Sequence, residues 1–214
     1  MTKKEEWLAG TRSAVPIMLG YVPVGIAYGV MARQAGLNTW QTVLMSLTVY
    51  GGASEMMAAG MVAQGAAVLT IVLTTFILNL RHIIMSTCVF NQMQGGRLPV
   101  RMLAAFGVTD ETFAVYTTTA NAPRTPRYFF SMAFCSYLSW ALGSWLGAIA
   151  TGLLPPLITA ALGISLYAMF IGLLMPGLHG NGRLAALVVL TALCNTVLCN
   201  VVQLDSGWSM ILST

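Results

Sequence analysis

Charged side chains occur inside sequence that is otherwise apolar enough to lie in a lipid bilayer. Glu55 follows a pair of glycines, and Arg81 and His82 follow the apolar run after it. An ionised side chain at the centre of a bilayer costs roughly 2.5 kcal/mol or more unless it is paired or hydrated. Because a carboxyl, a guanidinium and an imidazole occur within one hairpin's length, we interpret them as parts of a solute site inside a membrane.

The paired glycines Gly51 and Gly52 predict that a helix is interrupted just before Glu55. Adjacent glycines weaken a helix. Opened backbone at membrane depth persists only inside protein or beside a water-filled cavity. Unwound helix ends also present free N–H groups and a positive dipole end, which suit an anionic group of a solute. The interruption is therefore expected to be part of the site.

The composition indicates an all-α integral membrane protein. Of the 214 residues, 57% are hydrophobic and only 7% are charged, and the mean hydropathy is +0.78. Soluble domains carry about a quarter charged residues. At about 20 residues per spanning helix, the chain has room for six or seven segments and no sizeable soluble domain. We expect residues 1–214 to form a single polytopic membrane domain.

Neither nucleic acid, nor a metal, nor a cofactor is expected. The net charge of +4 comes from basic residues beside apolar segments, and no basic run is interleaved with aromatic residues. The cysteines all fall in apolar segments and form no Cys-x-x-Cys or Cys/His cluster, which is typical of small buried side chains.

Seven segments are predicted, and the second and fourth are expected to be broken or re-entrant. They cover about 14–32, 40–63, 66–91, 102–120 and 128–153, then the stretch between Pro156 and Pro176, and finally 184–204. The second is interrupted by its glycine pair, and the fourth carries Thr-Asp-Glu-Thr at its middle, from Thr109. Small residues one turn apart predict close packing between helices; they are Gly25 and Gly29 in the first segment, and Ser139, Gly143 and Gly147 in the fifth.

The placement of lysine and arginine predicts a cytoplasmic N-terminus and a C-terminus outside. These orientations hold whether all seven segments cross or the second and fourth dip in and return. The re-entrant arrangement leaves only Arg33 outside, which fits the positive-inside bias better. We favour seven segments, and the sequence does not choose between the two arrangements.

In several stretches taken in order, the chain resembles the AzlC family, the large subunit of bacterial branched-chain amino acid exporters. The matching pieces are Pro16 with Pro23-Val24-Gly25, Tyr50-Gly51-Gly52-Ala53-Ser54, Asn79-Leu80-Arg81-His82, Thr109-Asp110-Glu111-Thr112-Phe113, and Ala168-Met169-Phe170-Ile171-Gly172-Leu173-Leu174. The resemblance covers nearly the whole chain, and Asn-Leu-Arg-His and Thr-Asp-Glu are its most specific parts. Glu55 departs from the pattern, because the family usually has glutamine after the Gly-Ala/Ser-Ser turn.

The resemblance implies export of valine, leucine, isoleucine or a similar apolar amino acid, methionine included, across the bacterial cytoplasmic membrane. It also implies a small AzlD-type membrane subunit as partner. The carboxyl of Glu55 puts the substrate range or the coupling ion in doubt.

An amino acid substrate would use the polar groups of both broken segments. Free N–H groups suit its carboxylate, Glu55 or Asp110 could balance its ammonium group, and an embedded acid could carry a proton. The expected substrate-binding residues are Gly51, Gly52, Ala53, Ser54, Glu55, Asn79 and Asp110. Those expected for proton coupling or gating are Glu55, Arg81, His82, Asp110 and Glu111. Tyr50, Met56, Met57 and Phe113 could line an adaptable apolar pocket.

Structural roles for the same residues remain open at this stage. Arg81 and either Glu55 or Asp110 could form an ion pair that fixes helix register. His82 could be a hydrogen-bonded packing residue, and Asp110 with Glu111 could begin a solvated helix end.

Two other function classes fit the sequence less well, and no enzymatic activity is expected. Ser54 and His82 lie on neighbouring segments and could in principle form an intramembrane hydrolase. However, the local sequence lacks the Gly-x-Ser-x-Gly elbow and any identifiable oxyanion donor. A structural membrane subunit without transport has little use for intramembrane charges.

Overall fold

Every regular element in the described part of the chain is a helix. The computed structural model describes residues 1–120, 122–153 and 182–200, with isolated positions from 155 to 178. The helices are α1 (Lys3–Gln34), α2 (Thr39–Thr48), α3 (Gly52–Ala63), α4 (Val68–Asn79), α5 (Arg81–Gln92), α6 (Leu98–Phe106), α7 (Asp110–Thr118), α8 (Pro126–Ala150) and α10 (Gly182–Asn200). Most of the predicted sixth segment and residues 201–204 of the seventh lie outside the described residues.

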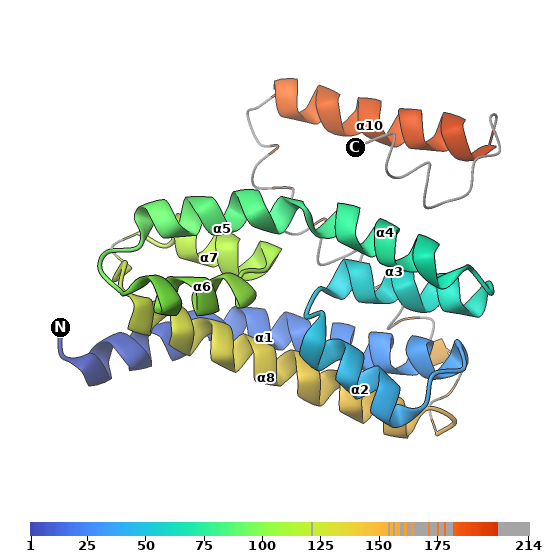
Figure 1. Cartoon of the computed structure of the whole chain (residues 1–214), viewed down its shortest axis with the longest axis horizontal. Helices are drawn as coiled ribbons and strands as arrows, with labels where there is room; N and C mark the ends of the chain where they lie inside the picture. The colour runs from blue at the N-terminus through green and yellow to red at the C-terminus, as the bar shows by residue number, and fades with distance from the viewer. Residues whose placement is uncertain are drawn as a thin grey trace.

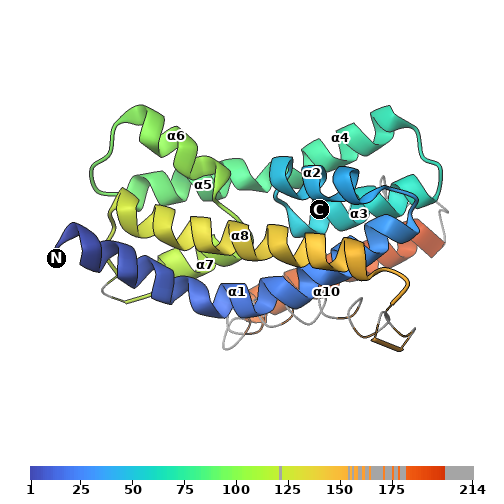
Figure 2. The same ribbon diagram turned by 90° about the horizontal axis from the view of Figure 1, so that it is seen from below.

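Helices α1 and α8 pack along one another and form one layer, at the lower side of the view in Figure 1 and facing the viewer in Figure 2. The small residues that predicted close packing meet at this contact. A Cβ on Gly25 would lie 3.0 Å from the carbonyl oxygen of Trp140, and one on Gly143 would lie 2.8 Å from that of Val22. The two helix backbones therefore approach too closely for larger residues at these positions, which confirms the predicted packing faces.

The predicted breaks in the second and fourth segments are present. Helix α2 ends at Thr48 and α3 begins at Gly52, with Gly51 in extended backbone as its N-cap. Helix α6 ends at Phe106 and α7 begins at Asp110. The N-cap of α7 is Thr109, whose hydroxyl accepts from the backbone N–H of Thr112, a capping arrangement that stabilises a helix start.

A third interruption was not predicted. The third segment divides into α4 and α5 at Leu80, whose N–H donates to the carbonyl of Ile77 in a tight turn. This one-residue turn adds to the two predicted breaks, and the Leu80 backbone itself stays in the right-handed helical region, with φ −57° and ψ −30°. The local sequence is uniformly apolar up to Asn79, and the turn coincides with a long-range contact of Arg81 described below, which no local pattern reports.

Among the residues that the structure describes, three helical stretches are long and apolar enough to cross a membrane: α1, the stretch Val68–Gln92 that α4 and α5 make together, and α8. Helices α2, α3, α6 and α7 have 9 to 12 residues each. At 1.5 Å per residue such helices are about half as long as a 30 Å hydrocarbon core. Each is thus at most half of a broken segment, as the interruptions require.

Candidate functional site

The three interruptions meet around one small cavity between the middle of α1 and the middle of α8. In Figures 1 and 2 the joint between α2 and α3 lies close to the joint between α4 and α5, and the loop from α6 to α7 ends beside them. The lining residues come from all three joints and from helices α1 and α8. They are Tyr21, Tyr50, Gly51, Gly52, Ala53, Arg81, His82, Thr109, Asp110, Glu111 and Trp140.

The cavity is too small for an amino acid in this conformation. Its volume of about 20 Å³ is roughly the space that one ordered water needs, whereas small-molecule pockets usually measure about 300 Å³ or more. In this structure, side chains therefore fill most of the space between the broken helices.

Glu55 lies behind the cavity and ties the first interruption together. Its side chain is fully buried, and Oε1 accepts from the backbone N–H of Gly51 at 3.0 Å. Oε2 accepts from the hydroxyl of Ser46 at 2.9 Å and from the indole N–H of Trp140 at 3.2 Å. The Ser46 Oγ also lies 2.7 Å from Ser144 Oγ on α8. The carboxyl thus joins the end of α2, the start of α3 and the middle of α8.

Glu111 holds the third interruption against α1. Its Oε2 accepts from the Tyr21 hydroxyl at 2.6 Å, and the same hydroxyl lies 2.7 Å from Thr109 Oγ1. All three side chains are buried. Because these groups line the cavity, the site contains a carboxyl at its wall that accepts a hydrogen bond from the Tyr21 hydroxyl.

An ion pair connects the second and third interruptions. Arg81 Nη2 lies 2.9 Å from Asp110 Oδ2, and the two side chains are 38% and 25% exposed. His82 Nδ1 lies 3.2 Å from the carbonyl oxygen of Asn79. The sequence left open whether Arg81 pairs with Glu55 or with Asp110. In the structure its partner is Asp110, and the pair is half-buried at the cavity wall.

Several buried polar atoms at the site have no hydrogen-bond partner. They are the Tyr50 hydroxyl, Asn79 Oδ1 and Arg81 Nε. Leaving a buried polar atom unpaired costs about 1–3 kcal/mol. The hydrogen-bonding groups around the cavity are therefore incompletely paired in this structure, and they remain available to a polar ligand.

The residues around this cavity lie within the part of the chain that matches a known family. The family model described as AzlC protein matches residues 16–154. The chain belongs to the AzlC family. The predicted resemblance is thus confirmed, and every residue that lines the cavity of this AzlC-family chain falls inside the matched range.

Three relatives illustrate the similarity. An uncharacterized membrane protein of Archaeoglobus fulgidus is 32% identical in a match that spans 87% of this chain and 82% of the relative. The inner membrane protein YgaZ of Escherichia coli is 31% identical in a match that spans 79% of this chain and 72% of the relative. The branched-chain amino acid transport protein AzlC of Bacillus subtilis is 27% identical in a match that spans 70% of this chain and 61% of the relative. No solved structure matches the chain.

The predicted site residues divide into two groups in the structure. Those that line the cavity are Gly51, Gly52, Ala53, Arg81, His82, Asp110 and Glu111. Glu55, Ser54 and Asn79 lie outside its lining. The Ser54 hydroxyl donates to the Gly51 carbonyl at 2.8 Å rather than to His82. Of the residues considered for an apolar pocket, Tyr50 alone lines this cavity.

Sequence reasoning missed the partners that α1, α2 and α8 supply, namely Tyr21, Ser46, Trp140 and Ser144. A polar or aromatic residue in a long apolar helix is too common to mark a site by itself. Gly52 is the one sequence feature that relates to these partners, because a side chain there would exclude Trp140: a Cβ on Gly52 would lie 3.0 Å from the Trp140 ring. The glycine pair thus both opens the backbone and lets an aromatic ring approach it.

Proposed function

We propose that this AzlC-family chain is a membrane transporter that exports branched-chain or other apolar amino acids. It would act as one polytopic domain in the bacterial cytoplasmic membrane, with its N-terminus in the cytoplasm and its C-terminus outside. The observation that carries the proposal is the meeting of three helix interruptions around one polar cavity. Transporters build midplane sites from such discontinuous helices. The name of the Bacillus subtilis relative supports the substrate class.

The charged groups at the cavity match the zwitterion of an amino acid. Arg81 and Asp110 neutralise one another in this structure. A substrate that entered between them would offer its carboxylate to Arg81 and its ammonium group to Asp110. The first N–H groups of α3, at Gly52 and Ala53, lie at the same wall and have no partner within their own helix.

Export against a gradient needs an energy source, for which we propose proton coupling. Glu111 is the best placed carboxyl, because it lines the cavity and has the Tyr21 hydroxyl as its donor. From the sequence, Glu55 was the first candidate for this role. Its two oxygen atoms already accept three hydrogen bonds behind the cavity, so we assign it to holding the interruption.

A small membrane subunit is proposed as partner. In the most apolar part of α4 and α5, only 6% of the residues are buried, against 50% in the most apolar parts of α1 and α8. In the described part of the chain these two helices therefore present an apolar surface that lipid or another membrane helix must cover. A partner seated there would also contact the interruption that carries Arg81.

The test is efflux from cells loaded with labelled amino acids, with the small subunit co-expressed. We expect valine, leucine, isoleucine and methionine to leave faster than from cells without the gene. Asp110→Asn and Arg81→Gln should abolish the difference, while Glu5→Gln on the exposed first turn of α1 should preserve it. If none of the four amino acids leaves faster with the unmodified chain, the substrate class is wrong.

A further inference from the structure

Tyr50 is under backbone strain at the edge of the site. Its φ of 46° makes it the only non-glycine residue with a left-handed backbone among those described. A tyrosine there is held by its surroundings and marks a place where function can store strain. Its side chain is only 4% exposed, and its hydroxyl has no hydrogen-bond partner.

The Tyr50 side chain separates two cavities. One is the polar cavity of about 20 Å³ already described. The other is an aromatic pocket of about 270 Å³ between α6 and α8, lined by Tyr50, Leu103, Ala104, Phe106, Gly107, Phe130, Ala133, Phe134 and Tyr137. The Tyr50 ring centroid lies 5.0 Å from that of Tyr137 and 6.0 Å from that of Phe106, and 6.4 Å from that of Tyr21 on the polar side.

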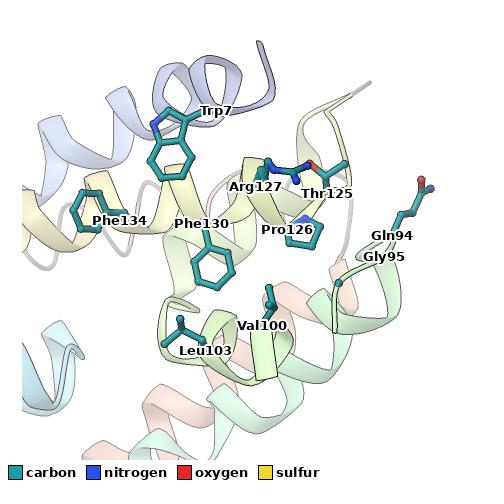
Figure 3. Close-up of a pocket in the computed structure, with 11 residues that line it drawn as sticks. Trp7, Gln94, Gly95, Val100, Leu103, Thr125, Pro126, Arg127, Phe130 and Phe134 are labelled. Atoms are coloured by element: carbon teal, nitrogen blue, oxygen red, sulfur yellow. The ribbon is translucent and has the colours of Figure 1, made fainter. Parts of the chain in front are cut away.

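The aromatic pocket continues toward the N-terminal ends of α1 and α8. It shares Leu103, Phe130 and Phe134 with a cavity of about 700 Å³ that also reaches Trp7 and Arg127. In Figure 3 the Phe130 ring extends from α8 toward Leu103 of α6. The three spaces therefore form a series that narrows from the N-terminal end of the molecule to the polar cavity.

We infer that an apolar amino acid reaches the polar cavity through the aromatic pocket between α6 and α8, and that Tyr50 is the gate between the two. The inference rests on the proposed function and adds the route and the gating residue. The lining is apolar and aromatic, which suits a branched side chain and disfavours a charged one. The unpaired Tyr50 hydroxyl faces no partner in this structure, so a polar group of the arriving solute would satisfy it.

The chain on both sides of Tyr50 is anchored by hydrogen bonds that do not involve Tyr50 itself. The Tyr137 hydroxyl donates to the carbonyl oxygen of Leu47 at 2.8 Å and so ties the end of α2 to α8. On the other side, Glu55 holds the N–H of Gly51. Opening requires Tyr50 to leave its left-handed backbone while these flanking contacts keep α2 and α3 in place.

The test uses a thiol inside the polar cavity. Thr109, which is only 5% exposed, is changed to cysteine in a chain whose native cysteines are replaced by alanine. Its rate of reaction with methyl methanethiosulfonate, a small neutral reagent, is measured in membranes. We expect Tyr50→Gly, which removes the ring and accepts the left-handed backbone, to raise the rate at least tenfold, and Tyr50→Phe, which keeps the ring, to leave it within twofold.

A second substitution tests the route. Ala133→Leu fills the aromatic pocket, and added to Tyr50→Gly it should return the rate to within twofold of the starting value. Ala141→Leu, at a half-buried position on the same helix that lines neither cavity, should not. The melting temperature of each variant confirms that it is folded.

A rate that Tyr50→Gly does not change overturns the gate. If Tyr50→Gly raises the reaction rate and the added Ala133→Leu does not lower it again, the reagent does not pass through the aromatic pocket and the route is overturned. This is the result expected if a lipid chain fills the pocket. As a second measurement with Tyr50 intact, Ala133→Leu should slow export of leucine at least threefold more than export of valine, and equal slowing also overturns the route. Absence of leucine export by the unmodified chain counts against the proposed function and leaves the labelling comparison valid.

Discussion

Replacing Glu55 with glutamine changes one buried atom from an acceptor to a donor, and its effect follows from three measured contacts. The carboxyl oxygens accept from Gly51 N at 3.0 Å, Ser46 Oγ at 2.9 Å and Trp140 Nε1 at 3.2 Å. All three partners donate, so a group with two acceptor atoms fits them. This accounts for a carboxyl at a position where the family resemblance anticipates glutamine.

The cost can be worked out from the two ways in which the amide can lie. If its nitrogen replaces Oε1, it faces the N–H of Gly51, which cannot accept. If its nitrogen replaces Oε2, it faces the indole N–H of Trp140, which cannot accept either, although Ser46 can rotate its hydroxyl toward Ser144. Each orientation leaves one fixed N–H donor buried without an acceptor, which costs about 1–3 kcal/mol.

The assay is denaturant unfolding in detergent micelles, with Glu5→Gln as the control. Glu5 belongs to the exposed capping box of α1, where glutamine is an equivalent partner, so no loss is expected there. We expect Glu55→Gln to lose about 1–3 kcal/mol. We also expect its loss to be less than additive with that of Trp140→Phe, because the two share a contact. Equal stability of Glu55→Gln and the unmodified chain would refute this reasoning.

Three further predictions concern packing and the site. Gly147→Ala should lose about 1–3 kcal/mol of stability, because its Cβ would lie 2.8 Å from the Ile26 carbonyl carbon and closer still to the carbonyl oxygen. Gly60→Ala, with no atom within 4 Å of the new Cβ, should lose none in the same unfolding assay. Ser54→Ala should keep leucine efflux with at most a lower affinity for leucine, and complete loss of efflux would contradict this. Tyr21→Phe removes the donor to Glu111 and should lower efflux driven by a proton gradient. Tyr116→Phe, a buried tyrosine whose hydroxyl has no partner, should not, and equal effects of the two would contradict the role of Glu111.

The class of the fold and two of its interruptions could be predicted because they depend on local properties. Composition alone separates a bilayer-embedded chain from a soluble one. The adjacent glycines weaken helix propagation at one point. Thr109 followed by Asp110 is typical of a helix start, because a threonine hydroxyl caps the first turn and an acid complements the dipole.

The composition of the site could not be predicted, because it depends on which distant helices meet. Trp140 and Glu55 are 85 positions apart, and Tyr21 and Glu111 are 90 apart. No spacing rule connects them, so the sequence placed Glu55 among the substrate-binding residues without indicating that its side chain is fully buried behind the cavity. The turn at Leu80 escaped prediction for the same reason, since its apolar neighbours read as continuous helix.

Binding of radiolabelled leucine to the purified chain, with the small subunit present, tests most directly whether the cavity at the three interruptions is the substrate site. A hydrogen bond between the charged Asp110 and the ammonium group of leucine would contribute about 1.5–3 kcal/mol to binding. A change of 1.4 kcal/mol corresponds to about a tenfold change in affinity. Asp110→Asn should therefore weaken binding at least tenfold, while Glu5→Gln leaves it unchanged. Equal affinity in Asp110→Asn and the unmodified chain would contradict the account.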